Sequence, residues 1–100
     1  MESALATKSS VLPGKMLGVG KNGLKILVAN LGGAFYTIGD ICTHMGCNLS
    51  DGTLRGGQVQ CPCHGSTFDI RTGVVIHGPA QKPEPSYALK IIGEQIVMSL

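Results

Sequence analysis

Short apolar stretches separated by glycine-containing turns run along most of the chain. The stretch 24–29, which is rich in aliphatic residues, follows an Asn22-Gly23 pair, and Gly32-Gly33 separates it from the apolar stretch 34–38. Asn-Gly between two apolar segments is a strong signal for a two-residue β-hairpin. With a shorter apolar segment at 15–19, the pattern predicts three strands in an antiparallel meander.

The second half of the chain repeats this pattern in shorter pieces. Glycine turns separate predicted strands at 53–54, 58–60, 67–70, 74–76, 87–92 and 95–100. Residues 1–10 are expected to form an edge strand or a loose end, and one helical turn is expected near 48–50. No stretch combines a helical period with helix caps. The sequence therefore predicts a single all-β domain over residues 1–100.

A proline-rich connection at residues 78–85 precedes the last predicted hairpin. Its prolines at 79, 83 and 85 favour an extended, stiff backbone. Lys82 and Glu84 are expected to form its solvated surface.

Composition narrows the classes of function. Hydrophobic residues make up 43% of the chain, which excludes wholesale disorder. The formal net charge is +2 without a basic run, which argues against nucleic acid as a partner. There is no apolar run long enough to cross a membrane and no apolar signal-peptide core. We expect a soluble, cytoplasmic protein. Its core is small, so a disulfide or a metal site would add usefully to its stability.

All four cysteines and two of the three histidines lie between residues 42 and 66. They form CTHMGC at 42–47, the first loop, and CPCHGS at 61–66, the second loop. Disulfides alone would allow three pairings. Structural zinc sites favour C-x2-4-C pairs, whereas the spacings here are C-x4-C and C-x-C. The C-x4-C-x2-C pattern of a four-cysteine [2Fe–2S] site is absent.

The histidines distinguish among these alternatives. His44 lies two residues after Cys42, and His64 lies three residues after Cys61, so each loop offers one thiolate and one imidazole. This set matches one [2Fe–2S] cluster with two cysteines on one iron and two histidines on the other. The third histidine, His77, lies outside both motifs and is expected to be solvated.

The double motif resembles that of Rieske proteins, in the form found in the cytochrome bc and b6f complexes. Segments 35–38, 49–52 and 68–73 also resemble soluble Rieske ferredoxins. The resemblance covers residues 11–100. It implies an antiparallel β-sandwich with a smaller cluster-binding subdomain of loops and short strands at about residues 40–80.

The resemblance also implies roles for individual residues. It places Cys42 and Cys61 on the buried iron and His44 and His64 on the outer iron, with a disulfide between Cys47 and Cys63. Such a bond is unusual in an unexported protein unless the organism is a hyperthermophile or the bond is well shielded. The remaining implied roles are backbone approach to the cluster at Gly46 and Gly65, a hydrogen bond from Ser66 to a bridging sulfide, and a covering loop at Gly78-Pro79.

Phe68 departs from the pattern of the high-potential members. These proteins carry a tyrosine two residues after the serine, and its hydroxyl donates to a ligand cysteine sulfur. Hydrogen bonds to sulfur stabilise the reduced cluster. We therefore expect a reduction potential below that of the membrane-complex proteins, while Ser66 and the disulfide keep it above ferredoxins that lack both.

The expected function is one-electron transfer, with a potential that depends on pH, rather than catalysis. The sequence shows no phosphate loop, no nucleophile beside a base and no paired carboxylates. We expect a monomer whose redox partner proteins dock transiently near His44 and His64, on an apolar rim of Met45, Leu49 and Pro79. The alternatives are a small Rieske subunit of a larger oxidoreductase, an oxygenase or nitrite reductase, and a zinc- or disulfide-stapled interaction module.

Overall fold

The computed structural model describes residues 2–43, 46–63 and 65–99, and in this part of the chain the regular structure is β-strand with two short 3-10 turns. The strands are β1 (Glu2–Thr7), β2 (Met16–Lys21), β3 (Leu24–Leu31), β4 (Ala34–Gly39), β5 (Thr53–Arg55), β6 (Gln58–Gln60), β7 (Thr67–Asp69), β8 (Val75–His77), β9 (Ala88–Ile92) and β10 (Gln95–Ser99); the turns are η1 (Lys8–Ser10) and η2 (Leu49–Asp51). The all-β prediction is confirmed. The predicted helical turn near 48–50 is η2, whereas η1 was not predicted.

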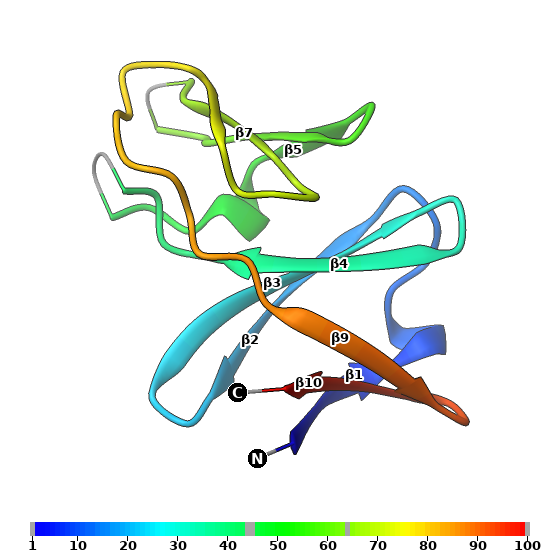
Figure 1. Ribbon diagram of the computed structural model, residues 1–100. Helices are drawn as coiled ribbons and strands as arrows, with labels where there is room; N and C mark the ends of the chain where they lie inside the picture. Colours follow the sequence, from blue (N-terminus) through cyan, green and yellow to red (C-terminus); the bar gives the residue numbers. More distant parts are fainter. Residues whose placement is uncertain (1, 44–45, 64, 100) are drawn as a thin grey trace.

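The strands form three antiparallel sheets. Two three-stranded sheets, in the orders β1-β10-β9 and β2-β3-β4, make the scaffold, and a four-stranded sheet β5-β6-β7-β8 lies at one end. Figure 1 shows the chain termini together at the opposite end, where β1 pairs with β10. The molecule measures 38 × 27 × 18 Å, so the small sheet and its loops occupy one end of an elongated body.

Strand β3 supplies side chains to two separate cores. Ile26 and Val28 point into the core between the two scaffold sheets, together with Ile96 of β10. Leu27 and Ala29 point the other way, into the core under the small sheet. A strand buried on both faces reads as a near-continuous apolar run, which is the pattern of residues 26–29. This strand therefore joins the scaffold to the subdomain.

The predicted hairpin at Asn22-Gly23 is confirmed. Both residues have positive φ, 53° and 78°, as a type I′ turn requires. The turn fixes the register of β2 against β3, with Lys21 opposite Leu24. Side chains alternate along β3, so Leu27 and Ala29 share the face that packs under the small sheet.

We predict that Gly52→Ala destabilises the subdomain. A Cβ at Gly52, directly after η2, would overlap the backbone carbonyl oxygen of Gln60 and lie 3.1 Å from Pro62 Cδ in the second loop. Overpacking of this kind costs about 1–3 kcal/mol of unfolding free energy, which chemical denaturation measures. Gly20→Ala is the matched control, because no atom lies within 4 Å of its added Cβ. Equal stability of the two variants would contradict the prediction.

Candidate metal centre

The first loop closes on itself through two backbone hydrogen bonds. The Cys42 N–H donates to the Cys47 carbonyl at 2.8 Å, and the Gly46 N–H donates to the Cys42 carbonyl at 2.9 Å. Gly46 has a φ of 77°, which a residue with a Cβ rarely adopts. The backbone of Cys42 is thus satisfied inside the loop.

The second loop repeats this arrangement. The Cys61 N–H donates to the Ser66 carbonyl at 2.7 Å, and the Gly65 N–H donates to the Cys61 carbonyl at 3.3 Å. Gly65 has a φ of 81°, close to that of Gly46. The two loops therefore present their first cysteine in the same local geometry.

The two leading cysteines are both buried and lie outside any disulfide. Cys42 is 2% exposed and Cys61 is 3% exposed, and both belong to the core that holds Phe68. Cys47 and Cys63 form a disulfide with their Cα atoms 6.5 Å apart, so the predicted bond between the loops is confirmed. The other two predicted ligands, His44 and His64, lie outside the described residues, as does Met45.

The sulfur chemistry fits an iron–sulfur cluster better than zinc. The Cys61 sulfur lies within 4.8 Å of the sulfurs of Cys47 and Cys63. Those two sulfurs are bonded to each other and cannot act as thiolates, so this trio is no three-cysteine site. What remains is one buried thiol in each loop. That is the cysteine contribution to a cluster with two cysteine and two histidine ligands.

The proline-rich connection is hydrogen-bonded to both loops. The Ala80 N–H donates to the Ser66 hydroxyl oxygen at 2.9 Å. The Thr43 hydroxyl donates to the Lys82 carbonyl at 2.7 Å. Because a hydroxyl accepts and donates at once, Ser66 can take the Ala80 N–H and still donate its own hydrogen.

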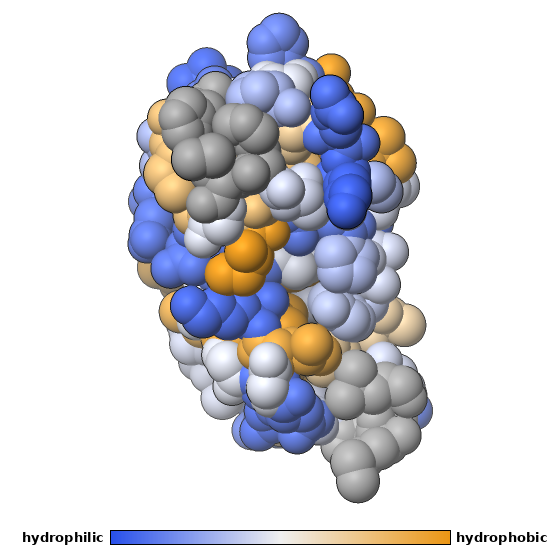
Figure 2. All heavy atoms as spheres, turned by 90° about the vertical axis from the view of Figure 1, so that its left-hand side faces the viewer, coloured by the Kyte–Doolittle hydropathy of each residue, from blue (hydrophilic) through white to orange (hydrophobic). Residues whose placement is uncertain are grey.

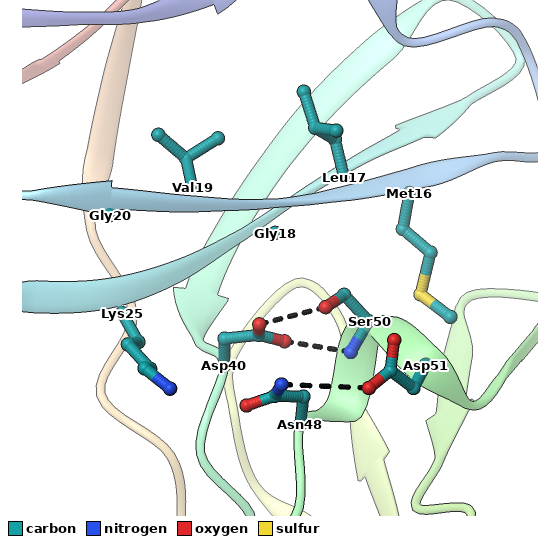
Figure 3. A pocket seen from close by; sticks show the side chains of 10 residues that line it. All are labelled: Met16, Leu17, Gly18, Val19, Gly20, Lys25, Asp40, Asn48, Ser50 and Asp51. Carbon is teal, nitrogen blue, oxygen red and sulfur yellow. Dashed lines mark hydrogen bonds between the residues drawn. The ribbon is translucent and has the colours of Figure 1, made fainter.

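Asp40 holds the far end of the first loop. Its two carboxylate oxygens accept hydrogen bonds from the Ser50 N–H at 2.7 Å and from the Ser50 hydroxyl at 2.8 Å (Figure 3). Burial raises the pKa of Asp40, and the hydrogen bonds from Ser50 oppose that rise. A surface hollow of about 440 Å³ opens beside it along β2. The carboxylate is used by Ser50, so we interpret Asp40 as structural.

Two expectations about side chains are wrong. Leu49 is fully buried beneath η2, where the first loop returns to the core, so it cannot belong to an exposed rim. Glu84 is 4% exposed rather than solvated, because it folds back under the first loop. Lys82, Pro79 and His77 are exposed as expected. Alternating prolines predict the extended backbone of residues 78–85, but they do not indicate which side chains turn inward.

The comparisons with known proteins agree with this geometry. The Rieske [2Fe-2S] domain family matches residues 2–92. The chain belongs to the Rieske [2Fe-2S] family. It is 32% identical to the ferredoxin component of the naphthalene 1,2-dioxygenase system of Pseudomonas putida, over 92% of this chain and 88% of that protein.

Other Rieske proteins resemble the chain over nearly its whole length. It is 36% identical to the cytochrome b6-f complex iron-sulfur subunit of Chlorobaculum thiosulfatiphilum, over 98% of this chain and 53% of the subunit. The solved Sphingomonas yanoikuyae B1 ferredoxin superposes with a TM-score of 0.95 at 29% identity and covers 100% of this chain and 99% of its own. A further match is a chain in the solved complex of reduced oxygenase and oxidized ferredoxin in carbazole 1,9a-dioxygenase. It superposes with a TM-score of 0.92 at 28% identity, over 98% of this chain and 92% of that chain.

Family and fold together establish what the chain does. It is an electron-transfer protein that uses a Rieske [2Fe–2S] cluster, and it is a carrier rather than an enzyme. The interaction-module alternative is thereby set aside. Across the described ranges, the structure contains no helix that could span a membrane.

The disulfide is expected to stabilise the metal centre. It links positions 16 residues apart, and closing a ring of about this size contributes roughly 3 kcal/mol in the chain-entropy model. We predict that the double variant Cys47→Ser, Cys63→Ser loses about that much unfolding free energy in chemical denaturation and loses its cluster absorbance faster. Wild-type protein treated with a reductant should match the variant. Unchanged stability and cluster lifetime would show that the bond is dispensable.

Proposed function

We propose that Cys42 and Cys61 ligate the inner iron of the cluster and that His44 and His64 ligate the outer iron. The observation that carries this proposal is the pair of buried thiols at equivalent positions of two loops with the same closing hydrogen bonds. When bound, the cluster takes up one electron. Two neutral imidazoles in place of two thiolates leave it less negative, which favours a potential within about −150 to +300 mV.

We further propose that the physiological partners are redox proteins of an oxygenase system, which dock transiently beside the two loops. Relatives named as ferredoxin components of dioxygenase systems, and the oxygenase–ferredoxin complex, support this partner class. Thr43, Pro79, Gln81 and Lys82 line a surface hollow of about 340 Å³ next to the first loop. Figure 2 faces the side of the molecule that lies at the left in Figure 1, and the surface visible there carries small hydrophobic patches separated by hydrophilic ones.

That mixed surface fits a short-lived complex better than a permanent one, because obligate interfaces are more hydrophobic. It favours a separate carrier over a fixed subunit of a larger oxidoreductase. We propose that the chain works as a monomer in the cytoplasm and exchanges between a reductase and an oxygenase.

Cluster assembly tests the ligand proposal. Purified protein is expected to contain iron and labile sulfide, to show a Rieske EPR signal on reduction, and to lose that signal in His64→Ala. The matched control is His77→Ala, because His77 is exposed and outside both motifs.

The reduction potential should fall as pH rises above neutrality, since the ferric state lowers the pKa of an imidazole ligand more than the ferrous state does.

Two outcomes would contradict these expectations. A colourless protein with zinc and neither iron nor sulfide would end the assignment of the ligands. A potential independent of pH from about 6 to 11 would exclude proton uptake by the two histidines.

We predict that Phe68→Tyr raises the reduction potential. Phe68 is fully buried in the same core as Cys42 and Cys61, between Val59 of β6 and Val75 of β8. A hydroxyl there that reaches a cysteine sulfur stabilises the reduced cluster. A hydroxyl that reaches none stays buried and unpaired and costs about 1–3 kcal/mol of stability. Redox titration and denaturation separate the two results, and an unchanged potential with lower stability would contradict the prediction.

A further inference from the structure

Glu84 is a buried carboxyl in the proline-rich connection that lies against the first loop. It is 4% exposed, and one of its oxygens accepts a hydrogen bond from the Thr43 backbone N–H. Its other oxygen, Oε2, is buried and has no hydrogen-bond partner among the described residues. Such a group is costly to bury, so its place in the fold requires an explanation.

The fold makes room for this carboxyl. A Cβ on Gly39, at the end of β4, would lie 2.6 Å from Glu84 Oε1 and 3.1 Å from Pro85 Cδ. The Gly39 N–H donates to the Pro85 carbonyl at 2.9 Å, and the Glu84 N–H donates to the Gly73 carbonyl at 2.8 Å. The backbone on both sides of Glu84 is therefore fixed to the scaffold and to the turn between β7 and β8.

Thr43 makes two hydrogen bonds to the segment 82–84 of the proline-rich connection. Its N–H donates to the Glu84 carboxyl, and its hydroxyl donates to the Lys82 carbonyl at 2.7 Å. Thr43 stands between Cys42 and His44, the two proposed ligands of the first loop. Whatever holds Thr43 therefore holds the backbone that carries both of them.

We propose that Glu84 is a positioning residue of the metal centre, which fixes the first loop through the Thr43 N–H and lowers the reduction potential of the cluster when it is ionised. The inference rests on the ligands proposed above. The carboxylate acts through Thr43 in the first role and through its field in the second. A negative charge in a poorly solvated place is screened much less than one at the surface.

Glu84 changes its protonation state near neutral pH. Burial raises its pKa to about 7, the hydrogen bond from Thr43 opposes the rise, and the charge of Asp40 adds to it. Asp40, directly after β4, is the charged side chain that acts on Glu84 in the described part of the chain. Gly73 contacts Glu84 through its backbone carbonyl, which accepts the Glu84 N–H. The coupling between the cluster and Glu84 is reciprocal. If an ionised Glu84 lowers the potential, then one electron supplied to the cluster by an external reductant raises the affinity of Glu84 for a proton from water.

The raised pKa has a consequence for stability. In the unfolded chain Glu84 ionises near its ordinary pKa of 4.5, whereas in the folded protein it keeps its proton to about 7. Its contribution to stability is complete below pH 4.5 and is lost as pH rises to about 7. Glu84→Gln should flatten this part of the stability profile.

Two variants separate the two roles. Glu84→Gln keeps an oxygen that accepts from Thr43 and removes the charge, so its potential should exceed that of the wild type above pH 7 and equal it below pH 6. Glu84→Ala removes the acceptor, so amide hydrogen exchange over residues 41–48 should accelerate by about tenfold or more. The control is Glu94→Gln, which removes an exposed charge from the turn between β9 and β10.

The outcomes are distinct from those that test the ligands. A Gln variant with the wild-type potential at every pH overturns the electrostatic role, and an Ala variant with wild-type exchange overturns the positioning role. If neither variant assembles a cluster, the test is an infrared difference spectrum of the wild type, reduced minus oxidised. The proposal is rejected if the band of a protonated carboxyl does not increase on reduction near pH 7. A wild type without a Rieske EPR signal would instead count against the proposed ligands.

Discussion

Two irregular loops must bring cysteine thiols into a core without bringing unpaired backbone with them, and this constraint shapes the metal centre. Buried peptide groups need hydrogen-bond partners, and a loop has no sheet or helix to supply them. Each loop solves the problem internally, since both the N–H and the C=O of its first cysteine are used within the loop. The cysteine side chain can then lie in the core while the rest of the loop stays near the surface.

The loops in turn depend on the elements that hold them together. The disulfide joins their outer parts, and the proline-rich connection joins their inner parts through Ser66 and Thr43. That connection is anchored at Gly39 and Gly73, so it transmits the position of β4 and of the small sheet to both loops. An electron-transfer site benefits from this rigidity, because a cluster whose ligands move little reorganises little when its charge changes.

Much of the fold follows from the sequence because the signals are local. The Asn22-Gly23 turn and the aliphatic run in β3 each predict one element from adjacent residues, and the structure contains both. The four proposed ligands and the disulfide pair also stand in short motifs. Leu49 and Glu84 were misassigned because their burial is decided by tertiary contacts. Leu49 is covered by the core under η2, and Glu84 by a connection that folds back on a loop some forty positions earlier in the chain.

Burial and hydrogen bonding act on the cluster's potential in opposite directions. A core of aliphatic and aromatic side chains removes water from around Cys42 and Cys61, which penalises the more negative, reduced state. Donors to sulfur offset that penalty, and Phe68 places a ring without a donor where a tyrosine could supply one. An ionised Glu84 would add to the penalty, and a protonated one would not. If these roles hold, a few groups within one small core set the potential, and the fold around them need not change.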